Sequence, residues 1–164
     1  MNRNASNFKR LLVLLPRDAS ASRTAERVDG ARARRQRRLS MKMLFTLAAL
    51  LGFFAVAVGA FAAHGLKGRL SPEAMAWMQT GVQYHGWHAL AALIALVFWR
   101  IAPAETGFRL AAIAFLVGVV VFSGSLYVMA LTGMRWLGAV TPIGGTAFLL
   151  GWIALAHAGF RSLP

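Results

Sequence analysis

Long apolar runs alternate with short charged segments over most of the chain. From residue 43 onward, four runs of 18 to 25 residues contain no charged side chain. About 20 apolar residues are enough to cross the hydrocarbon core of a bilayer as a helix, because each residue adds about 1.5 Å. The pattern predicts an all-α membrane protein with four transmembrane helices, at about residues 43–63, 85–101, 109–133 and 138–160.

The third run, Leu110–Gly133, holds 24 uncharged residues between Arg109 and Arg135. It contains the small and polar segment FSGSLY, Phe122–Tyr127. Hydrocarbon cannot satisfy serine hydroxyls, so we expect this segment to face neighbouring helices rather than lipid. The third span is therefore predicted to lie at the centre of the bundle. Gly133 is suited to the left-handed conformation that ends many helices.

The connection between the first and second spans carries a helix-start signal at Ser71-Pro72-Glu73. Serine is a good N-cap, proline fits the first helical position, and an acid is favourable in the first turn. Methionines and a valine then recur on one face, with Gln79 and Gln83 on another. The pattern predicts a short amphipathic helix at the membrane interface, with Trp77 as its headgroup-level anchor.

The start of the fourth span has two interpretations. Thr141-Pro142 could be the N-cap and first helical residue, with residues 136–140 lying in the interface. Alternatively, Pro142 kinks a longer helix. The sequence leaves both open.

Small and polar residues along the spans are candidates for close helix packing, since they let neighbouring backbones approach. We expect the first and fourth spans to pack on the third. The predicted helix-packing residues are Gly52, Gly59, Ser123, Gly124, Ser125, Thr141, Pro142, Gly144 and Gly145.

Residues 1–40 have no sustained apolar period. They hold eleven Lys and Arg against three Asp and Glu, including the run ARARRQRR at 31–38. A block this basic is typical of a disordered tail, and it could tether anionic lipid or nucleic acid. Alternatively, the start codon is Met41, which opens the membrane domain at 41–164. A third interpretation is a signal peptide cleaved after Ala60-Phe61-Ala62.

Charge also bears on orientation and partners. Most of the net charge of +13 lies in the first 40 residues, so no nucleic-acid partner is expected for the folded domain. Basic residues near the span ends favour a cytoplasmic N-terminus and C-terminus in a bacterial inner membrane. Only 14% of residues are charged, against about 25% in a soluble domain, so the bilayer is the expected environment.

Four blocks of sequence together resemble a known family. They are GAFAAHGL (59–66), TGVQYHGWHALA (80–91), FSGSLYVMALTG (122–133) and LGAVTPIGGTAFLLGW (137–152). They resemble the small bacterial inner-membrane family catalogued as domain of unknown function 423, to which a eukaryotic transmembrane protein 256 is related. The resemblance covers about residues 41–158. It implies the fold and the location, and it carries over no catalytic residue.

The sequence contains few residues that could bind a metal or take part in catalysis. His64, His85 and His88 are expected at one membrane surface, where three imidazoles could bind Zn²⁺ or Cu²⁺. There is no cysteine, which excludes disulfides and thiolate metal sites. No Asp, Glu, Lys or Arg lies in the middle of a span, which argues against a proton-coupled pump. No P-loop, nucleophile elbow or dinucleotide fingerprint is present.

The sequence therefore predicts a non-catalytic multi-pass membrane protein that assembles with itself or with a larger membrane complex. No cofactor is expected. One alternative is a pathway for a small solute or ion along Ser123, Ser125 and Thr141. A second alternative is metal or redox handling by His64, His85 and His88.

Overall fold

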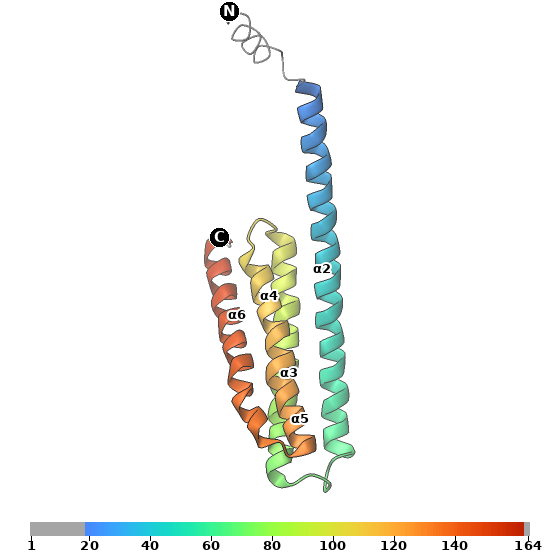
Figure 1. Cartoon of the computed structure of the whole chain (residues 1–164), viewed down its shortest axis with the longest axis vertical. Helices are drawn as coiled ribbons and strands as arrows, with labels where there is room; N and C mark the ends of the chain where they lie inside the picture. The colour runs from blue at the N-terminus through green and yellow to red at the C-terminus, as the bar shows by residue number, and fades with distance from the viewer. Residues whose placement is uncertain (1–18, 163–164) are drawn as a thin grey trace, which may run out of the picture. The chain divides into compact units, whose positions relative to one another are not determined.

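The computed structural model describes residues 19–162, with side chains from residue 26 onward, and every element in this part of the chain is helical (Figure 1). The elements are α2 (Ala19–His64), α3 (Pro72–Ile101), α4 (Gly107–Gly118), η1 (Val119–Ser123), α5 (Gly124–Thr132), η2 (Arg135–Ala139) and α6 (Thr141–Ser162). The predicted all-α class is confirmed over these residues.

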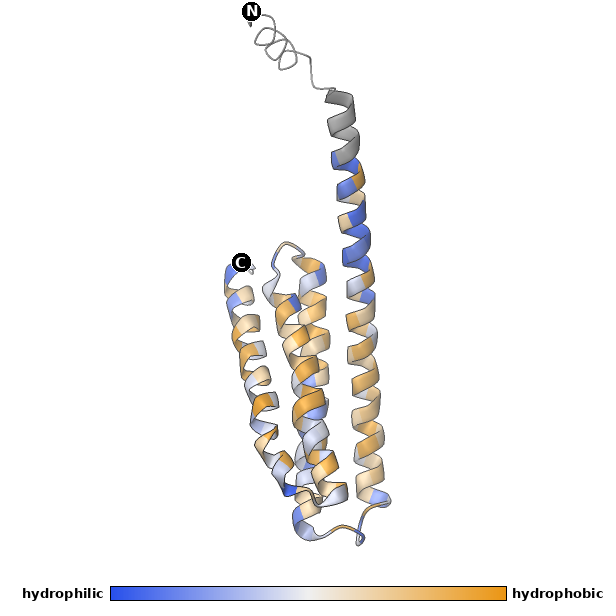
Figure 2. Cartoon of the chain, in the orientation of Figure 1, coloured by the Kyte–Doolittle hydropathy of each residue, from blue (hydrophilic) through white to orange (hydrophobic). Residues whose placement is uncertain are grey.

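Three helical segments are long and apolar enough to cross a membrane: Glu26–His64, Gly107–Thr132 and Arg135–Ser162. Large hydrophobic side chains are exposed along all the long helices. A soluble protein would bury such side chains, whereas lipid-facing helices expose them. Figure 2 shows hydrophobic residues along the ribbons of all the long helices.

The chain divides into two units between Ser40 and Met41, and α2 runs through this boundary without a break. Residues 19–40 form part of α2, whereas the sequence indicates a basic tail at 1–40, and the division of the chain at residue 41 stays a prediction. Residues 1–18 lie outside the described part. The run ARARRQRR is made of strong helix formers, and it extends a helix that the apolar residues after it already nucleate. Figure 2 shows α2 changing from hydrophilic to hydrophobic along its length.

α3 begins as the sequence predicts, but it is longer. The Ala74 amide donates a hydrogen bond of 3.2 Å to the Ser71 hydroxyl, with Pro72 and Glu73 in the first turn. The helix then continues for 30 residues to Ile101. Residues 72–83 are therefore its first turns and not a separate interfacial helix. No proline follows Pro72 within α3, and the helix has no reason to break near residue 83.

The third run forms α4, η1 and α5 in direct succession. Half of its most apolar stretch is buried, against 11% for the segment that ends at His64 and 17% for Arg135–Ser162. Its central place in the bundle is thus as predicted. A π-helical turn, η1, inserts at its middle, and α5 ends at Gly133 with φ of 74°. The predicted left-handed cap is confirmed.

α4 and α6 interlock through a repeated Phe-x-x-Gly pattern, FLVG at 115–118 and FLLG at 148–151. A Cβ atom added to Gly151 would lie 2.6 Å from the ring of Phe115. One added to Gly118 would lie 2.4 Å from the ring of Phe148. Each phenylalanine therefore occupies the space that the other helix leaves open at its glycine. This exchange is possible because the two helices run in opposite directions (Figure 1).

The backbone of α6 also lies directly on η1. A Cβ atom on Gly144 would come within 2.4 Å of the Phe122 backbone nitrogen. By contrast, one on Gly124 would meet no atom within 4 Å. The structure gives no support for close packing at Gly124, and the residues on either side of it point about 100° away from it around the helix. Ser123 and Ser125, the residues before and after Gly124, are both buried.

The remaining predicted packing glycines also differ in whether a neighbouring helix lies close to them. Gly59 is close to Val82, with 3.1 Å from an added Cβ atom to the valine methyl, and Gly145 is at an ordinary 3.8 Å from Phe122. Gly52 has no atom within 4 Å. Ala48, Ala55 and Ala62, seven residues apart, are the buried small residues of α2.

The start of α6 favours one of the two interpretations of Pro142. The helix begins at Thr141, so Pro142 lies in its first turn and does not kink it. Residues 135–139 form the separate 3₁₀ turn η2.

The contact between α6 and η1 predicts opposite effects for two matched substitutions. Gly144→Ala should lower stability by about 1–3 kcal/mol, since a methyl group would collide with the Phe122 backbone. Gly124→Ala should be neutral or stabilising by up to about 1 kcal/mol, because alanine is the better helix former. Thermal unfolding of both proteins in detergent measures this. Equal melting temperatures would contradict the direct backbone contact.

Candidate functional site

His88 lies near the middle of α3 and is 4% exposed. Its Nδ1 atom is 2.9 Å from the carbonyl oxygen of Tyr84, and its Nε2 atom is 3.2 Å from the indole nitrogen of Trp152. A carbonyl only accepts hydrogen bonds and an indole N–H only donates them. The imidazole is therefore neutral, with its proton on Nδ1 and its lone pair held by Trp152.

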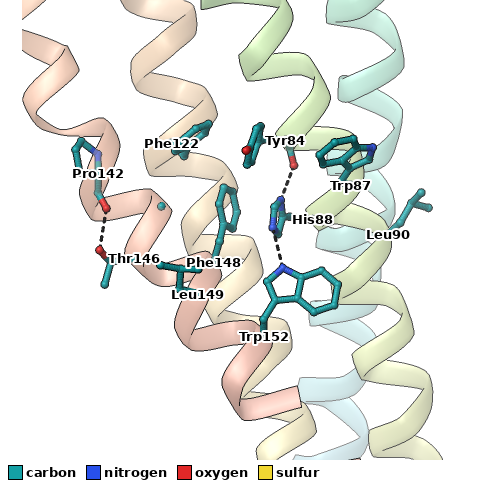
Figure 3. A pocket seen from close by; sticks show the side chains of 11 residues that line it. Tyr84, Trp87, His88, Leu90, Phe122, Pro142, Thr146, Phe148, Leu149 and Trp152 are labelled. Atoms are coloured by element: carbon teal, nitrogen blue, oxygen red, sulfur yellow. Dashed lines mark hydrogen bonds between the residues drawn. The ribbon is translucent and has the colours of Figure 1, made fainter. Parts of the chain in front are cut away.

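Aromatic rings from three elements surround this imidazole (Figure 3). The ring of Phe148 in α6 stacks on it, with centroids 3.5 Å apart and planes at 12°. Phe122 of η1 lies 5.4 Å from Phe148 and 4.8 Å from Tyr84 of α3. The contacts join α3, η1 and α6 into one aromatic cluster around a single polar ring.

A groove with a volume of about 820 Å³ opens beside this cluster, between α3 and α6. Its rim is exposed: Trp87 is 55% and Leu90 59% accessible. Figure 3 shows the rings of Tyr84, Phe122 and Phe148 gathered together with His88 and Trp152. We call this the aromatic groove, and its ring-bearing walls are Tyr84, Trp87, His88, Phe122, Phe148 and Trp152.

His85, three residues before His88, has a different environment. It is 5% exposed, and its Nδ1 atom is 3.1 Å from the hydroxyl of Tyr127 in α5. Its Nε2 atom is buried without a hydrogen-bond partner in the described part of the chain, and so is the hydroxyl of Ser123. Two polar atoms are thus left unpaired inside the bundle.

The structure does not bring His64, His85 and His88 together as one group. Among residues 26–162, no three His, Cys, Asp or Glu side chains come together at a spacing that could hold a metal ion. His64 is exposed at the end of α2, and the lone pair of His88 is engaged by Trp152. The prediction assumed that the second span starts at His85 and His88. Because α3 begins at Pro72, both residues lie deep inside the helix.

Of the three hydroxyls proposed for a solute pathway, those of Ser125 and Thr141 pair with protein groups, and that of Ser123 does not. Ser125 lies 2.9 Å from the hydroxyl of Thr141 and 2.8 Å from the carbonyl oxygen of Phe122. Thr141 is also 3.2 Å from the carbonyl oxygen of Leu137. These contacts fasten α5 to the start of α6, which is a packing role.

A second, smaller groove of about 190 Å³ lies between the apolar part of α2 and the first turns of α3. Small residues of α2, Gly59 and Ala63, form one wall. The amide side chains of Gln79 and Gln83 from α3, both exposed, form part of the other. We call this the amide groove.

Sequence reasoning missed the partners of the histidines. Tyr84 is one helical turn from His88, so the YHGWH segment held a local signal for that bond. Trp152 is 64 residues away from His88 and Tyr127 is 42 from His85, and no local pattern connects them. Only the packing of α3 against α5 and α6 reveals these pairs.

Apolar helices of spanning length, exposed hydrophobic side chains and buried polar groups that mostly pair between helices define a helical membrane protein. The chain belongs to the family described as "Protein of unknown function (DUF423)", which matches residues 58–145. The predicted family is confirmed.

Curated relatives support this assignment. The UPF0382 membrane protein of Haemophilus influenzae is 47% identical over 119 residues, which cover 71% of this chain and 93% of that protein. The UPF0382 membrane protein YwdK of Bacillus subtilis is 37% identical over 123 residues, covering 75% and 100%. The UPF0382 inner membrane protein YgdD of Escherichia coli is 37% identical over 124 residues, covering 75% and 93%. No solved structure matches the chain.

The geometry around His88 predicts a difference between two tryptophans. Trp152→Phe keeps a ring in place but leaves His88 Nε2 as a buried acceptor without a donor, which should cost about 1–3 kcal/mol. Trp87→Phe is the matched control, because Trp87 is exposed on the rim of the groove. Thermal unfolding in detergent compares the two. A Trp152→Phe protein as stable as the control would contradict the hydrogen bond.

Proposed function

We propose that α3 is a further membrane span, so that the chain crosses the bilayer four times. Trp77 and Trp99 are 22 positions apart in this helix, which is about 33 Å. The hydrocarbon core is about 30 Å thick, and tryptophan prefers the two interfaces. The polar residues between them reduce the apolar character of α3, but its two histidines are buried in the bundle, away from lipid.

Charges at both ends of α3 support this placement. Arg135 lies over the ring of Trp77, at 5.7 Å, and pairs with Glu73 at 2.6 Å. Arg109 lies over the ring of Trp99, also at 5.7 Å. Each tryptophan thus has an arginine beside its ring, although Trp99 is itself buried in the core, and no Asp, Glu, Lys or Arg lies between the two tryptophans in α3.

The membrane domain in this proposal is residues 41–164, with residues 1–40 as a basic extension. YwdK matches over its whole length within 123 residues, which supports a domain of this size. In this proposal both termini lie in the cytoplasm of a bacterium. The membrane is the bacterial inner membrane, because the relative YgdD is named an inner membrane protein. The basic residues on the cytoplasmic side would be Lys42, Arg100, Arg109 and Arg161, together with the extension.

Alkaline phosphatase fusions, active only outside the cytoplasm, should then give a defined pattern. A fusion after Gly68 is expected to be active, and fusions after Ala104 and Pro164 inactive. The first two positions flank α3, so they must differ if α3 crosses the membrane. Equal activity at Gly68 and Ala104 would exclude α3 as a span.

The function that the geometry supports best is assembly, without catalysis, with a second copy of this chain through the amide groove. The observation that carries it is the exposure of Gln83 within a span. Gln83 is six positions past Trp77 and therefore about 9 Å below the headgroup level. An amide that faces hydrocarbon is costly, and a neighbouring helix can satisfy it. Gly59 and Ala63 leave room for such a helix to approach closely.

Single cysteines test this assembly directly, because the natural chain has none. In membranes, an Ala63→Cys protein, which places the cysteine in the same groove and keeps the Gln83 amide, should form a disulfide-linked dimer on mild oxidation. Leu150→Cys, exposed on α6 away from the groove, is the control and should remain monomeric. Monomer at both positions, or equal dimer at both, would contradict assembly through this groove. A cross-link to a protein of different mass would identify another membrane partner instead.

A further inference from the structure

The aromatic groove lies at the middle of the proposed membrane, and this depth rests on the proposal that α3 is a span. His88 is 11 positions from Trp77 and 11 positions from Trp99, which is about 17 Å from each. The groove opens to the outside of the bundle at Trp87 and Leu90, whose side chains are more than half exposed. A molecule dissolved in the bilayer could therefore enter it from the side.

The residue types in the groove are unusual for this depth. Tyrosine and tryptophan normally sit at the interfaces, where their polar ends reach water. Here Tyr84, Trp87 and Trp152 gather around His88 at mid-depth, where aliphatic side chains would meet lipid at lower cost. Flat rings with polar edges are suited to bind another flat ring.

The shape of the groove fits a molecule of small size. Its volume of about 820 Å³ falls within the range of about 300–1,000 Å³ typical of ligand sites. Gly145 keeps it open, since a Cβ atom there would be 3.8 Å from the ring of Phe122 and in no collision. A larger side chain at this position would fill the groove rather than disturb the helix contact.

Among the groove residues, the hydroxyl of Tyr84 and the indole N–H of Trp87 are the hydrogen-bond donors that remain available in the described part of the chain. Both nitrogens of His88 are engaged, and the Thr146 hydroxyl donates to the carbonyl oxygen of Pro142 at 2.9 Å. The Tyr84 hydroxyl takes part in none of the side-chain hydrogen bonds found among residues 26–162, and its ring faces Phe122 and Phe148. A ligand that complements this groove therefore needs a flat ring and a hydrogen-bond acceptor on it.

We propose that the aromatic groove binds a lipid-soluble molecule of the quinone class. Its conjugated ring would stack against Tyr84, Phe122 and Phe148, and a ring carbonyl would accept a hydrogen bond from the Tyr84 hydroxyl. The apolar tail of the quinone would extend from the groove past Leu90 into the bilayer. A lipid acyl chain is the poorer fit, because it has neither a flat face for the rings nor an acceptor at this depth.

The test uses the full chain in detergent and decylubiquinone as the probe, with quenching of tryptophan fluorescence as the readout. Trp87 and Trp152 border the groove, so quenching should be saturable. Gly145→Leu should abolish the saturable part, while Gly52→Leu, at an open position on another helix, should leave it intact. Tyr84→Phe removes only the hydroxyl and should weaken binding about three- to tenfold.

Quenching that is not saturable in the natural protein would overturn the proposal. So would saturable quenching that Gly145→Leu and Tyr84→Phe both leave unchanged. A phosphatidylcholine with brominated acyl chains serves as the competing probe. If it quenches Trp87 and Trp152 and displaces decylubiquinone at equal concentration, the groove is a lipid-chain site and the quinone proposal fails. The phosphatase fusions on either side of α3 test the membrane depth separately.

Discussion

Hydrocarbon offers no hydrogen-bond partner, and this constraint accounts for most of the polar contacts inside the bundle. The imidazole of His88 is paired on both nitrogens, Ser125 and Thr141 pair with each other, and His85 reaches Tyr127. Each of these contacts, apart from the bond to the Tyr84 carbonyl, joins two helices. The polar residues thus hold the helices in register, because a separated helix would leave its polar groups in lipid.

Close approach of the backbones is the second requirement. The rings of Phe115 and Phe148 lie where Gly151 and Gly118 carry no side chain, so α4 and α6 meet at short range. Gly144 brings α6 onto the backbone of η1. These contacts bring Phe148 and Trp152 to α3, where they meet His88. The aromatic groove is therefore a product of the glycine contacts behind it.

Much of the fold could be predicted from the sequence, because its signals are local. Apolar runs mark the helices, Ser71 begins α3, and Gly133 ends α5. The direction in which a small residue points depends on which helices surround it, and for this reason Gly144 packs closely while Gly124 does not. The length of α3 was underestimated because polar residues within a buried helix resemble an interfacial segment. Helix formation before Met41 was missed because a basic composition was weighed above helix propensity.

The candidate site was the least predictable part. The three histidines were assigned to one membrane surface, and the structure instead buries two of them and leaves His64 apart. Pairs such as His88 and Trp152 depend on tertiary packing across 64 residues. The YHGWH segment, which lies inside one of the four family blocks, carries both buried histidines.

The central claim is that α3 crosses the bilayer with His88 at its middle. Spin labels at Ala76, Leu90 and Ile101, all exposed positions of α3, measure this in reconstituted membranes through their accessibility to oxygen and to a water-soluble relaxant. The account predicts that the label at Leu90 is the deepest, near the bilayer centre, and that the labels at Ala76 and Ile101 lie near opposite surfaces. A label at Leu90 as accessible to the water-soluble relaxant as the other two would contradict it.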